Sequence, residues 1–434
     1  MYFLYSIAYS IGFVLMIPAF LLNRQKYASG FRERLGNYHE FRPDDRKVIW
    51  LHCVSVGETN AARPLVDQLL EAFPDHRLIV STTTKTGQEL ARRIFADKVD
   101  TVFYFPFDWK FTVRRAIDHF KPSLVLLMET EIWPRLIHEA KLSGARIAIV
   151  NGRLSENSFR RYSKVRSFIS RVLSDVDLAL MQGEQDANRI KSLGLDAAKV
   201  EVTNNLKFDL QLTEEDTWLT REFRNRYAFS SHDFLIVAAS THAPEERIVT
   251  EEFKKLVAAF PEITFRLLVA PRHPERFEEV AAYLDSLDVK SARRSSQETE
   301  ADKDAQIILL DTIGELRSLY ELADIVFVGG SLIPHGGQSI LEPAAVGRPI
   351  VIGPFTHNFE EVVNLFVREK ALTQLFDNSG TSLPVGLFEE LDSLVRHEDF
   401  RRFIGANARS LMNANRGASS KTVEYLIAAF SSPE

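Results

Sequence analysis

Short apolar runs alternate with longer stretches of helical periodicity along most of the chain. In the first half these runs predict strands at Val48–Val54, Arg77–Ser81, Thr101–Phe105, Ser123–Met128, Arg146–Val150, Asp177–Met181 and Lys199–Val202. Strands that are separated by helices pair in parallel, and helices then cover both faces of the sheet. The first half of the chain therefore predicts a parallel α/β domain.

A second series of the same kind follows a polar segment at 212–225. Its apolar runs predict strands at Phe234–Ala239, Phe265–Ala270, Gln306–Leu310, Ile325–Val328 and Pro349–Ile352. The polar stretch at 291–304 is expected to be a surface loop. The stretch Lys421–Phe430 is amphipathic and is expected to form a helix near the end of the chain.

With 434 residues the chain is too long for a single core of ordinary size. We predict an α/β protein with two Rossmann-like, doubly wound domains that face a cleft, over residues 23–211 and 226–415. A linker or helix over 212–225 joins them, and a C-terminal helix over 416–434 can pack back on the first domain. Because ligands of such sheets bind at the carboxyl ends of strands, the loops there hold the candidate site residues.

The first 22 residues contain no charged side chain. As a helix they would measure about 33 Å, enough to cross the hydrocarbon core of a bilayer. Interfacial aromatics are expected at one end, where the chain has Tyr2, Tyr5 and Tyr9. Basic residues follow at Arg24, Lys26, Arg32 and Arg34, which places the remaining chain in the cytoplasm by the positive-inside rule. We predict an N-terminal membrane anchor over 1–22 that spans the bilayer or lies in its interface; a cleaved signal is disfavoured because no A-x-A site follows.

Composition narrows the function further. The net charge of −6 argues against nucleic acid as a partner, and the single cysteine, Cys53, fits a reducing compartment. No P-loop, G-x-S-x-G elbow, C-x-x-C or H-E-x-x-H pattern occurs. A D-x-D string stands at Asp175-Val176-Asp177, but it runs into an apolar strand, so a metal site is not expected there.

The segment from Asp324 to Glu361 has the pattern of a β-α-β unit with a glycine-rich loop. The glycine pairs Gly329-Gly330 and Gly336-Gly337 follow the strand, and a helical pattern starts near Gln338. Glycines let the backbone approach a ligand, and a helix start offers free N–H groups to a phosphate. The alternative, a turn that needs glycine only for its conformation, stays open.

Carboxylates and a lysine follow strands of the first domain. Glu58 stands at a helix start, where it can serve as a general base or as an N-terminal cap. A helix N-terminus lowers the pKa of a carboxyl, whereas burial raises it. Glu131, in the string E-T-E-I-W-P after the strand at Ser123–Met128, can orient a hydroxyl or cap a helix. Lys207 can neutralise negative charge or be simply solvated.

A basic excess extends from Asn151 to Arg171, with six basic residues against one acid, Glu156. It suits anionic lipid head groups or an anionic acceptor, although a solvated basic helix would look the same. In the second domain Arg272 follows a predicted strand and can bind a phosphate with its planar fork. His335 and His357 flank the glycine loop, and each counts for little as a single histidine.

Several segments taken together resemble the bacterial 3-deoxy-D-manno-octulosonic acid (Kdo) transferases of lipopolysaccharide synthesis. They are WLHCVSVGETNAARPLV, METEIWPRLI, NGRLSENSFRRY, NLKFD, VAASTHAPEE, APRHPERF and GGQSILEPAAVGRPIVIGP. The resemblance implies a GT-B fold, a CMP-Kdo donor, a lipid A precursor as acceptor, and transfer at the cytoplasmic face of the inner membrane.

The resemblance also implies roles for residues. Glu58 matches the base of the family, and Glu131 and Lys207 match groups that assist the transition state, with Glu129 as the alternative to Glu131. Segments that hold CMP match Pro271, Arg272, Gly314, Glu315, Leu316, Ser339, Ile340, Leu341 and Glu342.

The expected reaction is a single displacement that inverts the anomeric centre, with no metal or cofactor. Two other enzyme activities stay open from the residues alone: a GT-B transferase that uses a UDP-sugar, and a sugar-nucleotide epimerase. The sequence leaves the oligomeric state open.

Overall fold

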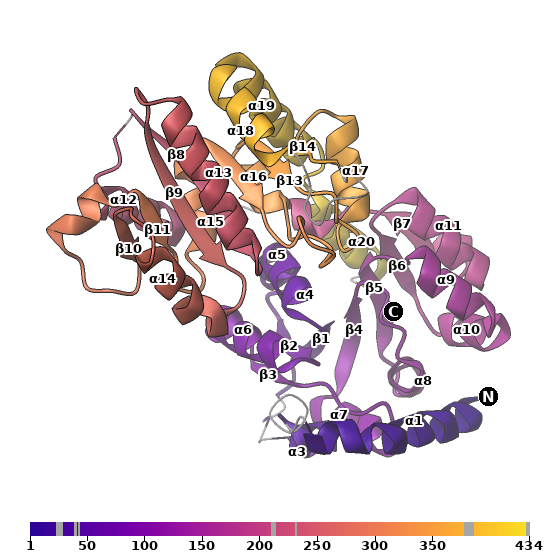
Figure 1. The fold of residues 1–434 in the computed structure, drawn as a ribbon. Coiled ribbons are helices and arrows are strands. Elements are labelled where there is room, and N and C mark those ends of the chain that lie inside the picture. The colour runs from indigo at the N-terminus through magenta and orange to yellow at the C-terminus, as the bar shows by residue number, and fades with distance from the viewer. Residues whose placement is uncertain are drawn as a thin grey trace. The chain divides into compact units, whose positions relative to one another are not determined.

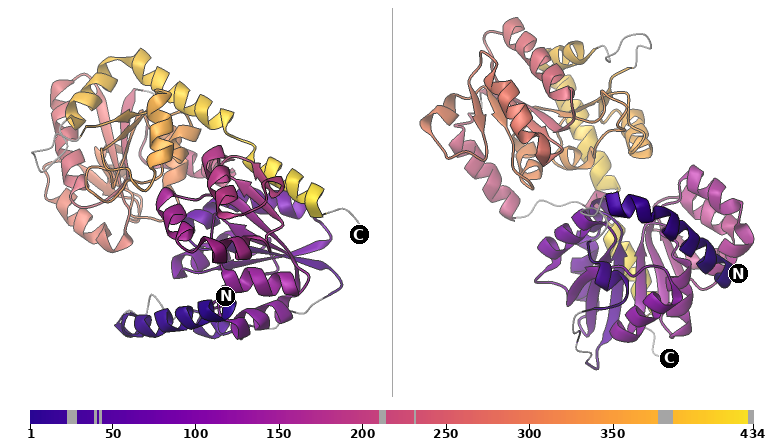
Figure 2. Two further views of the ribbon diagram at one scale, coloured as in Figure 1. Left: turned by 90° about the vertical axis from the view of Figure 1, so that its right-hand side faces the viewer. Right: turned by 60° about the horizontal axis from the view of Figure 1, so that its bottom comes forward.

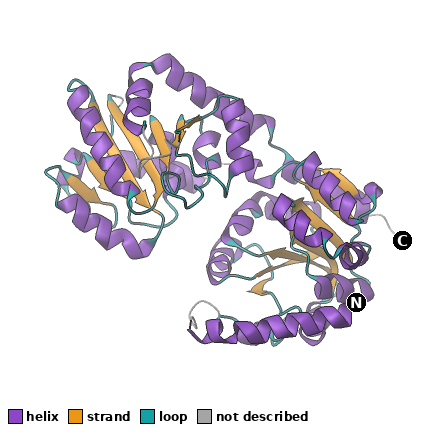
Figure 3. Cartoon of the chain, turned by 45° about the vertical axis from the view of Figure 1, so that its right-hand side comes forward, coloured by secondary structure: helices purple, strands orange, loops and turns teal. Residues whose placement is uncertain are grey.

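The computed structural model describes residues 1–22, 29–38, 41, 44–209, 214–230, 232–376 and 386–430. The chain divides into two compact units. Residues Met1–Asp209 and Asn415–Glu434 form the first unit, and Leu210–Ala414 form the second. Each unit is a parallel sheet with helices on both faces, as Figures 1 and 3 show. The two α/β domains expected from the sequence are therefore present.

The sheet of the first unit has the strand order β3-β2-β1-β4-β5-β6-β7, and every recorded pairing is parallel. The strands are β1 (Lys47–Cys53), β2 (His76–Thr82), β3 (Thr101–Tyr104), β4 (Pro122–Met128), β5 (Arg146–Gly152), β6 (Leu178–Met181) and β7 (Val200–Val202). The helices between them are α4 (Val56–Ala61), α5 (Arg63–Ala72), α6 (Lys85–Phe95), α7 (Lys110–Phe120), α8 (Pro134–Leu142), α9 (Glu156–Ser163), α10 (Arg166–Leu173) and α11 (Glu184–Leu193). Two short 3-10 helices, η1 (Ala197–Lys199) and η2 (Leu206–Asp209), flank β7.

Strand β1 shows why this sheet is covered on both faces. Successive side chains of a strand point to opposite faces. Val48 and Trp50 belong to one buried cluster, whereas Ile49, Leu51 and Cys53 belong to another. An uninterrupted apolar run therefore places two hydrophobic layers on one sheet, which is the pattern of a central parallel strand.

The last helix, α20 (Ala418–Phe430), completes the first unit (Figure 2). Leu426 and Val423 are buried in the same cluster as Leu65 of α5. The carboxylate of Asp209 accepts hydrogen bonds from the backbone N–H groups of Gly417 and Ser419, both at 2.6 Å. The C-terminal helix thus packs on the unit that contains the N-terminus.

The second unit has the strand order β10-β11-β9-β8-β12-β13-β14, again in parallel. Its strands are β8 (Asp233–Thr241), β9 (Thr264–Pro271), β10 (Ser291–Arg293), β11 (Ile307–Leu309), β12 (Ile325–Val328), β13 (Ile350–Ile352) and β14 (Thr373–Gln374). Its helices are α12 (Glu214–Arg226), α13 (Glu245–Ala259), α14 (Phe277–Asp285), α15 (Leu316–Leu319), α16 (Leu341–Ala345), α17 (Glu360–Arg368), α18 (Leu387–Arg396) and α19 (Glu398–Ala414). Three 3-10 helices complete the unit: η3 (Pro274–Arg276), η4 (Glu300–Asp304) and η5 (Tyr320–Leu322).

One polar segment of this unit, 291–304, is more ordered than expected. The stretch 291–304, predicted as a loop, contains the edge strand β10. The buried guanidinium of Arg226 binds the Asp302 carboxylate at 2.7 Å and the carbonyl groups of Arg293 and Arg294, which holds this stretch in place. Arg226 ends α12, so the segment 212–225, predicted as a linker or a helix, is a helix of the second unit from Glu214 onward.

The N-terminal helix α1 (Tyr2–Leu22) is present and is followed by a short helix, α3 (Phe31–Arg34). Among the described residues, however, no helix combines the length and the apolar character needed to cross a membrane. The expectation of an anchor that spans the bilayer is therefore not supported. Of the four basic residues that followed the anchor, Arg24 and Lys26 lie outside the described residues, and Arg34 places its guanidinium over the ring of Tyr104.

Instead, α1 lies along the first unit (Figure 2), held by directional contacts. The hydroxyl of Tyr5 donates to Asp108 at 2.7 Å, and that of Tyr2 donates to Asp175 at 3.2 Å. Arg135 donates to the hydroxyl of Ser6 at 2.9 Å. The tyrosines that were expected at a membrane interface thus attach this helix to the protein.

Candidate active site

Glu58 lies at the start of α4, in the loop that follows β1. Its carboxylate accepts hydrogen bonds from the Val54 N–H at 2.7 Å and from the Ser55 hydroxyl at 3.1 Å. Ser55 is the N-cap of the helix, and its side-chain oxygen accepts the Glu58 N–H. Glu58 is buried, with only 6% of its surface exposed, and it lies at the carboxyl edge of the sheet. The capping contact fixes the position of this carboxylate.

The pKa of Glu58 is raised to about 8 from its ordinary value of 4.5. Burial is the main cause, because the charged form loses hydration, and the negative charge of Glu129 adds to it. The hydrogen bond from Val54 acts in the opposite direction without cancelling these effects. Burial therefore outweighs the hydrogen bonds from Val54 and Ser55, both of which lower the pKa.

Glu129 and Lys207 form an ion pair beside Glu58. The Nζ atom of Lys207 lies 3.1 Å from a carboxylate oxygen of Glu129, and both side chains are half-buried. Glu129 has a φ of +53°, a left-handed conformation that is uncommon outside glycine and marks strain at a strand end. Asn151, near the end of β5, has the same φ, and its side chain accepts the N–H of Leu206 at 2.9 Å, next to Lys207.

Glu131 is half-buried, and its pKa is raised by burial and by the charge of Glu129. Glu131 also raises the pKa of Glu58, so the three carboxylates interact at one edge of the sheet. The structure thus brings together the residues predicted in this unit: Glu58, Glu131 and Lys207. Glu129, which sequence reasoning offered only as an alternative to Glu131, is the partner of Lys207.

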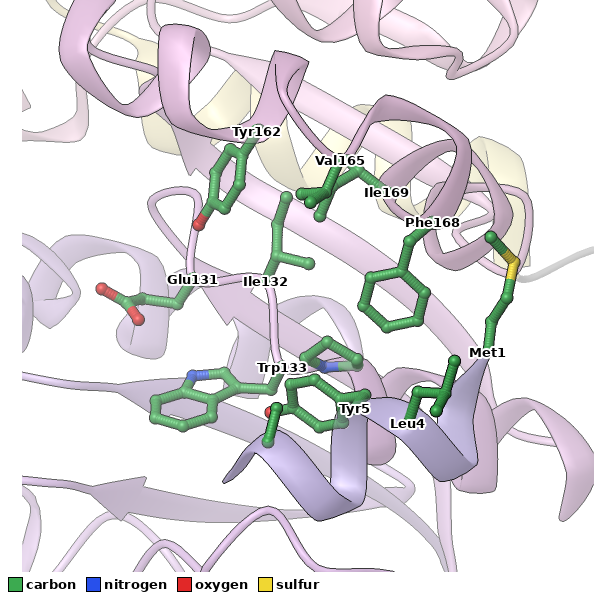
Figure 4. Close-up of a pocket in the computed structure, with 12 residues that line it drawn as sticks. Met1, Leu4, Tyr5, Glu131, Ile132, Trp133, Tyr162, Val165, Phe168 and Ile169 are labelled. Carbon is green, nitrogen blue, oxygen red and sulfur yellow. The ribbon is translucent and has the colours of Figure 1, made fainter. Parts of the chain in front are cut away.

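A cavity of about 550 Å³ adjoins Glu131 (Figure 4). Its walls come from α1, from the loop between β4 and α8, and from α9 and α10. The lining is mostly apolar and includes Leu4, Trp133 and Phe168. Sequence reasoning did not find this cavity, because its walls are assembled from segments more than 120 residues apart.

In the second unit, a buried carboxylate organises the glycine loop. Glu245 is fully buried at the start of α13 and accepts four backbone N–H groups at 2.6–2.9 Å, from His242, Gly330, Ser331 and Leu332. A Cβ atom at Gly329 would lie 2.6 Å from the Cα atom of Thr241, so the loop packs directly on the end of β8. The first glycine pair therefore serves close packing.

Three histidines from three strand-end loops lie together. The ring of His242, after β8, lies 4.0 Å from that of His335 and 5.1 Å from that of His273, between ring centroids. Gln338 is within 3.2 Å of the Nε2 atom of His242. Burial and the neighbouring histidines lower the pKa of His242 to about 4, so it is neutral at pH 7. Sequence reasoning had given His335 little weight because its neighbours are distant in the sequence.

The residues predicted to hold CMP lie at the end of β9 or in the segments that follow β11 and β12, at this carboxyl edge. Pro271 is buried at the end of β9, and the side chain of Arg272 is exposed beside it. Gly314 has a φ of +97°, and Leu316 begins α15. Glu315 already binds Arg294 at 2.7 Å, so its carboxylate is engaged within the protein.

The helix predicted to start near Gln338 begins only at Leu341 and has five residues. The hydroxyl oxygen of Ser339 accepts a hydrogen bond from the Leu341 N–H at 3.4 Å. Ile340 and Leu341 are buried, so a ligand could meet only their backbone groups, whereas Glu342 is half-buried. The expected helix start near Gln338 is therefore wrong by three residues.

The D-x-D string is structural. Asp175 binds Tyr2 and His138, and Asp177 binds Lys141 at 2.6 Å and the N–H of Ile147. In the part of the chain that the structure describes, no group of three or more His, Cys, Asp or Glu side chains is arranged to hold a metal ion.

Comparison with known proteins identifies the family. Residues 29–210 match the family model of the 3-deoxy-D-manno-octulosonic-acid transferases. The chain is 34% identical, over 92% of its length and 91% of its relative's, to the 3-deoxy-D-manno-octulosonic acid transferase of Haemophilus influenzae. The chain belongs to the Kdo transferase family. The transferase of Bordetella pertussis is 32% identical over 87% of this chain and 86% of its own.

Solved structures agree with the fold of this Kdo transferase. The UDP-GlcNAc 2-epimerase of Neisseria meningitidis superposes with a TM-score of 0.61 at 14% identity, covering 88% of this chain and all of its own. A glycosyltransferase of Rickettsia africae gives 0.56 at 15% identity, over 90% of this chain and all of its own. At this identity the likeness concerns the fold alone. The family relationship makes the protein a glycosyltransferase that moves Kdo in lipopolysaccharide biosynthesis.

Proposed function

We propose that this Kdo transferase moves Kdo from CMP-Kdo to a lipid A precursor at the cytoplasmic face of the inner membrane, with inversion and with Glu58 as general base. The observation that carries the proposal is the buried Glu58 carboxylate, whose pKa is raised to about 8. A general base is most effective when its pKa lies near the working pH. A solvated or purely capping glutamate would lack this basicity.

The chemical step is a single displacement. Glu58 removes the proton of an acceptor hydroxyl while the hydroxyl oxygen forms a bond to the anomeric carbon of Kdo. The bond from that carbon to the phosphate oxygen of CMP breaks, and its electrons leave with CMP. Lys207, held by Glu129 at 3.1 Å, places a positive charge near the carboxylates and the anionic acceptor. Glu131 orients the acceptor hydroxyl.

The second unit holds the donor. Arg272 is exposed at the end of β9 and can bind the CMP phosphate through its fork. Backbone groups of the loops at Gly314 and Ser339 meet the nucleoside, and the neutral imidazole of His242 offers a hydrogen bond. The reaction needs no metal or cofactor, because the leaving group carries one phosphate that a single guanidinium and a few N–H groups can stabilise.

The first unit meets the membrane through α1, which lies in the interface. One face of α1 is attached to the protein by Tyr2, Tyr5 and Ser6. Large apolar side chains are exposed on the helix at Phe3, Leu4, Ile7, Ile11, Val14, Leu15, Met16 and Ile17. Such a helix inserts its apolar side to the depth of the head groups. Exposed basic residues at the end of α9, such as Arg161 and its C-cap Lys164, suit anionic lipid phosphates.

Mass spectrometry of the product tests this proposal. The protein is incubated with CMP-Kdo and a tetraacyl lipid A precursor, and we expect the acceptor to gain the mass of one or more Kdo groups. No gain in mass would contradict the proposal, and a gain with a UDP-sugar instead would favour the other class of donor. Full activity in excess chelator is expected, and a loss that magnesium restores would contradict the metal-free step.

A further inference from the structure

The cavity beside Glu131 has a polar end and an apolar body. Figure 4 shows Glu131 at one end and Met1 and Leu4 at the other, with Trp133 and Phe168 between them. The hydroxyl of Tyr5 is committed to Asp108 at 2.7 Å, so the ring of Tyr5 supplies apolar surface to the wall. The volume of about 550 Å³ is within the range of about 300–1,000 Å³ that is typical of small-molecule sites.

We infer that this cavity binds one acyl chain of the lipid acceptor, with the head group at Glu131 and the chain running along α1. The inference rests on the proposed function, and it adds a specificity site that the transfer chemistry itself does not require. An amphiphile fits the arrangement because the only carboxylate of the lining stands at the end nearest the candidate catalytic residues.

Continuity with the exposed face of α1 favours a lipid chain over other apolar ligands. Leu4 and Ala8 line the cavity and are exposed, and Phe3, Ile7 and Ile11 on the same helix are exposed apolar side chains. A chain could therefore pass from the bilayer into the cavity without crossing water. Moving one methylene from lipid into water would lower the equilibrium constant for the transfer roughly fourfold. A path that does not cross water avoids this penalty.

The wall formed by α1 is fixed before any ligand binds. The Trp109 indole N–H donates to the Ser10 hydroxyl at 2.9 Å, and the guanidinium of Arg135 donates to the Tyr2 carbonyl at 2.8 Å. The ring of Tyr5 stacks on that of Phe168, at 5.7 Å between centroids. A pre-formed wall spares the ligand the entropy of ordering a helix. The N-terminal helix thus becomes part of the acceptor site.

The decisive variant is Ala8→Phe, which places an aromatic ring in the cavity from an exposed position of α1. Leu142→Phe is the matched control, because it adds a ring at an exposed position of the same unit, on α8, outside the cavity lining. Val165→Trp narrows the cavity from the opposite wall and guards against a folding defect in the first variant.

Each protein is assayed with the tetraacyl precursor and with the same disaccharide phosphate after complete deacylation. We expect Ala8→Phe and Val165→Trp to raise KM for the tetraacyl acceptor about tenfold with little change in kcat, which corresponds to about 1.4 kcal/mol. For the deacylated acceptor both parameters should stay at the wild-type values, and Leu142→Phe should leave the kinetics with both acceptors unchanged. Equal changes for both acceptors, or no change for either, would overturn the inference.

A readout independent of catalysis uses a fatty acid with a terminal diazirine. Photolysis should label peptides that contain Val165 or Phe168 in the wild type and in Leu142→Phe, and label them less in Ala8→Phe. Labels confined to the outer residues of α1, such as Phe3, would refute an acyl site. If the wild type transfers Kdo to neither acceptor but is still labelled in the cavity, the proposed function fails while the lipid site stands.

Discussion

The Nζ atom of Lys207 lies 3.1 Å from the carboxylate of Glu129 and so joins the loop after β7 to the loop after β4. Glu58 stands on the loop after β1, and its pKa responds to the charge of Glu129. The charged side chains of three strand-end loops therefore interact electrostatically. The coupling means that changes at one carboxylate should alter the titration of another.

Replacement of Glu58 by Gln should lower kcat by about 10²–10⁴, with a smaller change in KM, because a positioned general base contributes a factor of that size. The amide oxygen of Gln can still accept the Val54 N–H, so the fold should persist. Steady-state kinetics and a thermal melt check this expectation. Wild-type turnover in the Glu58→Gln protein would remove Glu58 from the mechanism.

The pH–rate profile should show an ascending limb with a midpoint near 8, because Glu58 must lose its proton to act as a base. In Glu129→Gln this midpoint should move to lower pH, since the charge that raises the pKa of Glu58 is removed and Lys207 loses its partner. In Glu131→Gln it should move less, because Glu131 is the weaker of the two influences. If the ascending limb has the same midpoint in both variants as in the wild type, the titration that it reports belongs to a group other than Glu58.

The same shift predicts how stability depends on pH. The folded protein binds the Glu58 proton more tightly than the unfolded chain, whose carboxyl has the ordinary pKa of 4.5. The contribution of this group is therefore fully present below pH 4.5 and is lost as the pH rises to about 8. Relative to the wild type, Glu58→Gln should gain stability over this window, as urea unfolding at pH 5 and pH 8 would measure. An equal difference at both pH values would contradict the raised pKa.

Glu245→Ala should destabilise the second unit by about 3 kcal/mol or more, because four backbone N–H groups would lose a buried charged acceptor. Glu251, exposed on the same helix, provides the control, and its replacement by Ala should change stability by no more than about 0.5 kcal/mol. Denaturant unfolding distinguishes the two variants. Equal effects would mean that the glycine loop does not depend on Glu245.

Arg272→Ala should weaken CMP binding by about 10- to 100-fold, the loss expected for a hydrogen-bonded charge pair. Arg402→Ala removes an exposed arginine of α19 that pairs with Glu398, and should leave CMP affinity unchanged. Isothermal titration with CMP measures both. An Arg272→Ala protein with wild-type affinity would move the phosphate site away from the end of β9.

Membrane attachment through α1 should depend on its exposed side chains. Phe3 and Leu15 are 73% and 74% exposed, and replacement of both by Glu should reduce co-flotation with anionic vesicles several-fold. Phe376 in the second unit is 83% exposed, and Phe376→Glu should have no effect. Flotation that is insensitive to the α1 double variant would place the contact elsewhere.

The layers of the fold could be predicted because parallel strands are continuous apolar runs, and β12 was predicted at its exact bounds. The edge strand β10 escaped detection because its residues are polar and its order depends on the distant Arg226. The location of Glu58 at the carboxyl edge of the sheet could be predicted, because Glu58 follows a strand in the sequence. The cluster of His242, His273 and His335 did not, because sheet order alone brings those loops together.

The packing of α20 on α5 makes the first unit discontinuous in sequence, with the second unit inserted between Asp209 and Asn415. During synthesis the groove that receives Leu426 stays uncovered until the final helix has left the ribosome. A fragment that stops at Asp209 would expose apolar surface around Leu65, and it should be prone to aggregate unless the missing helix is added back as a separate peptide.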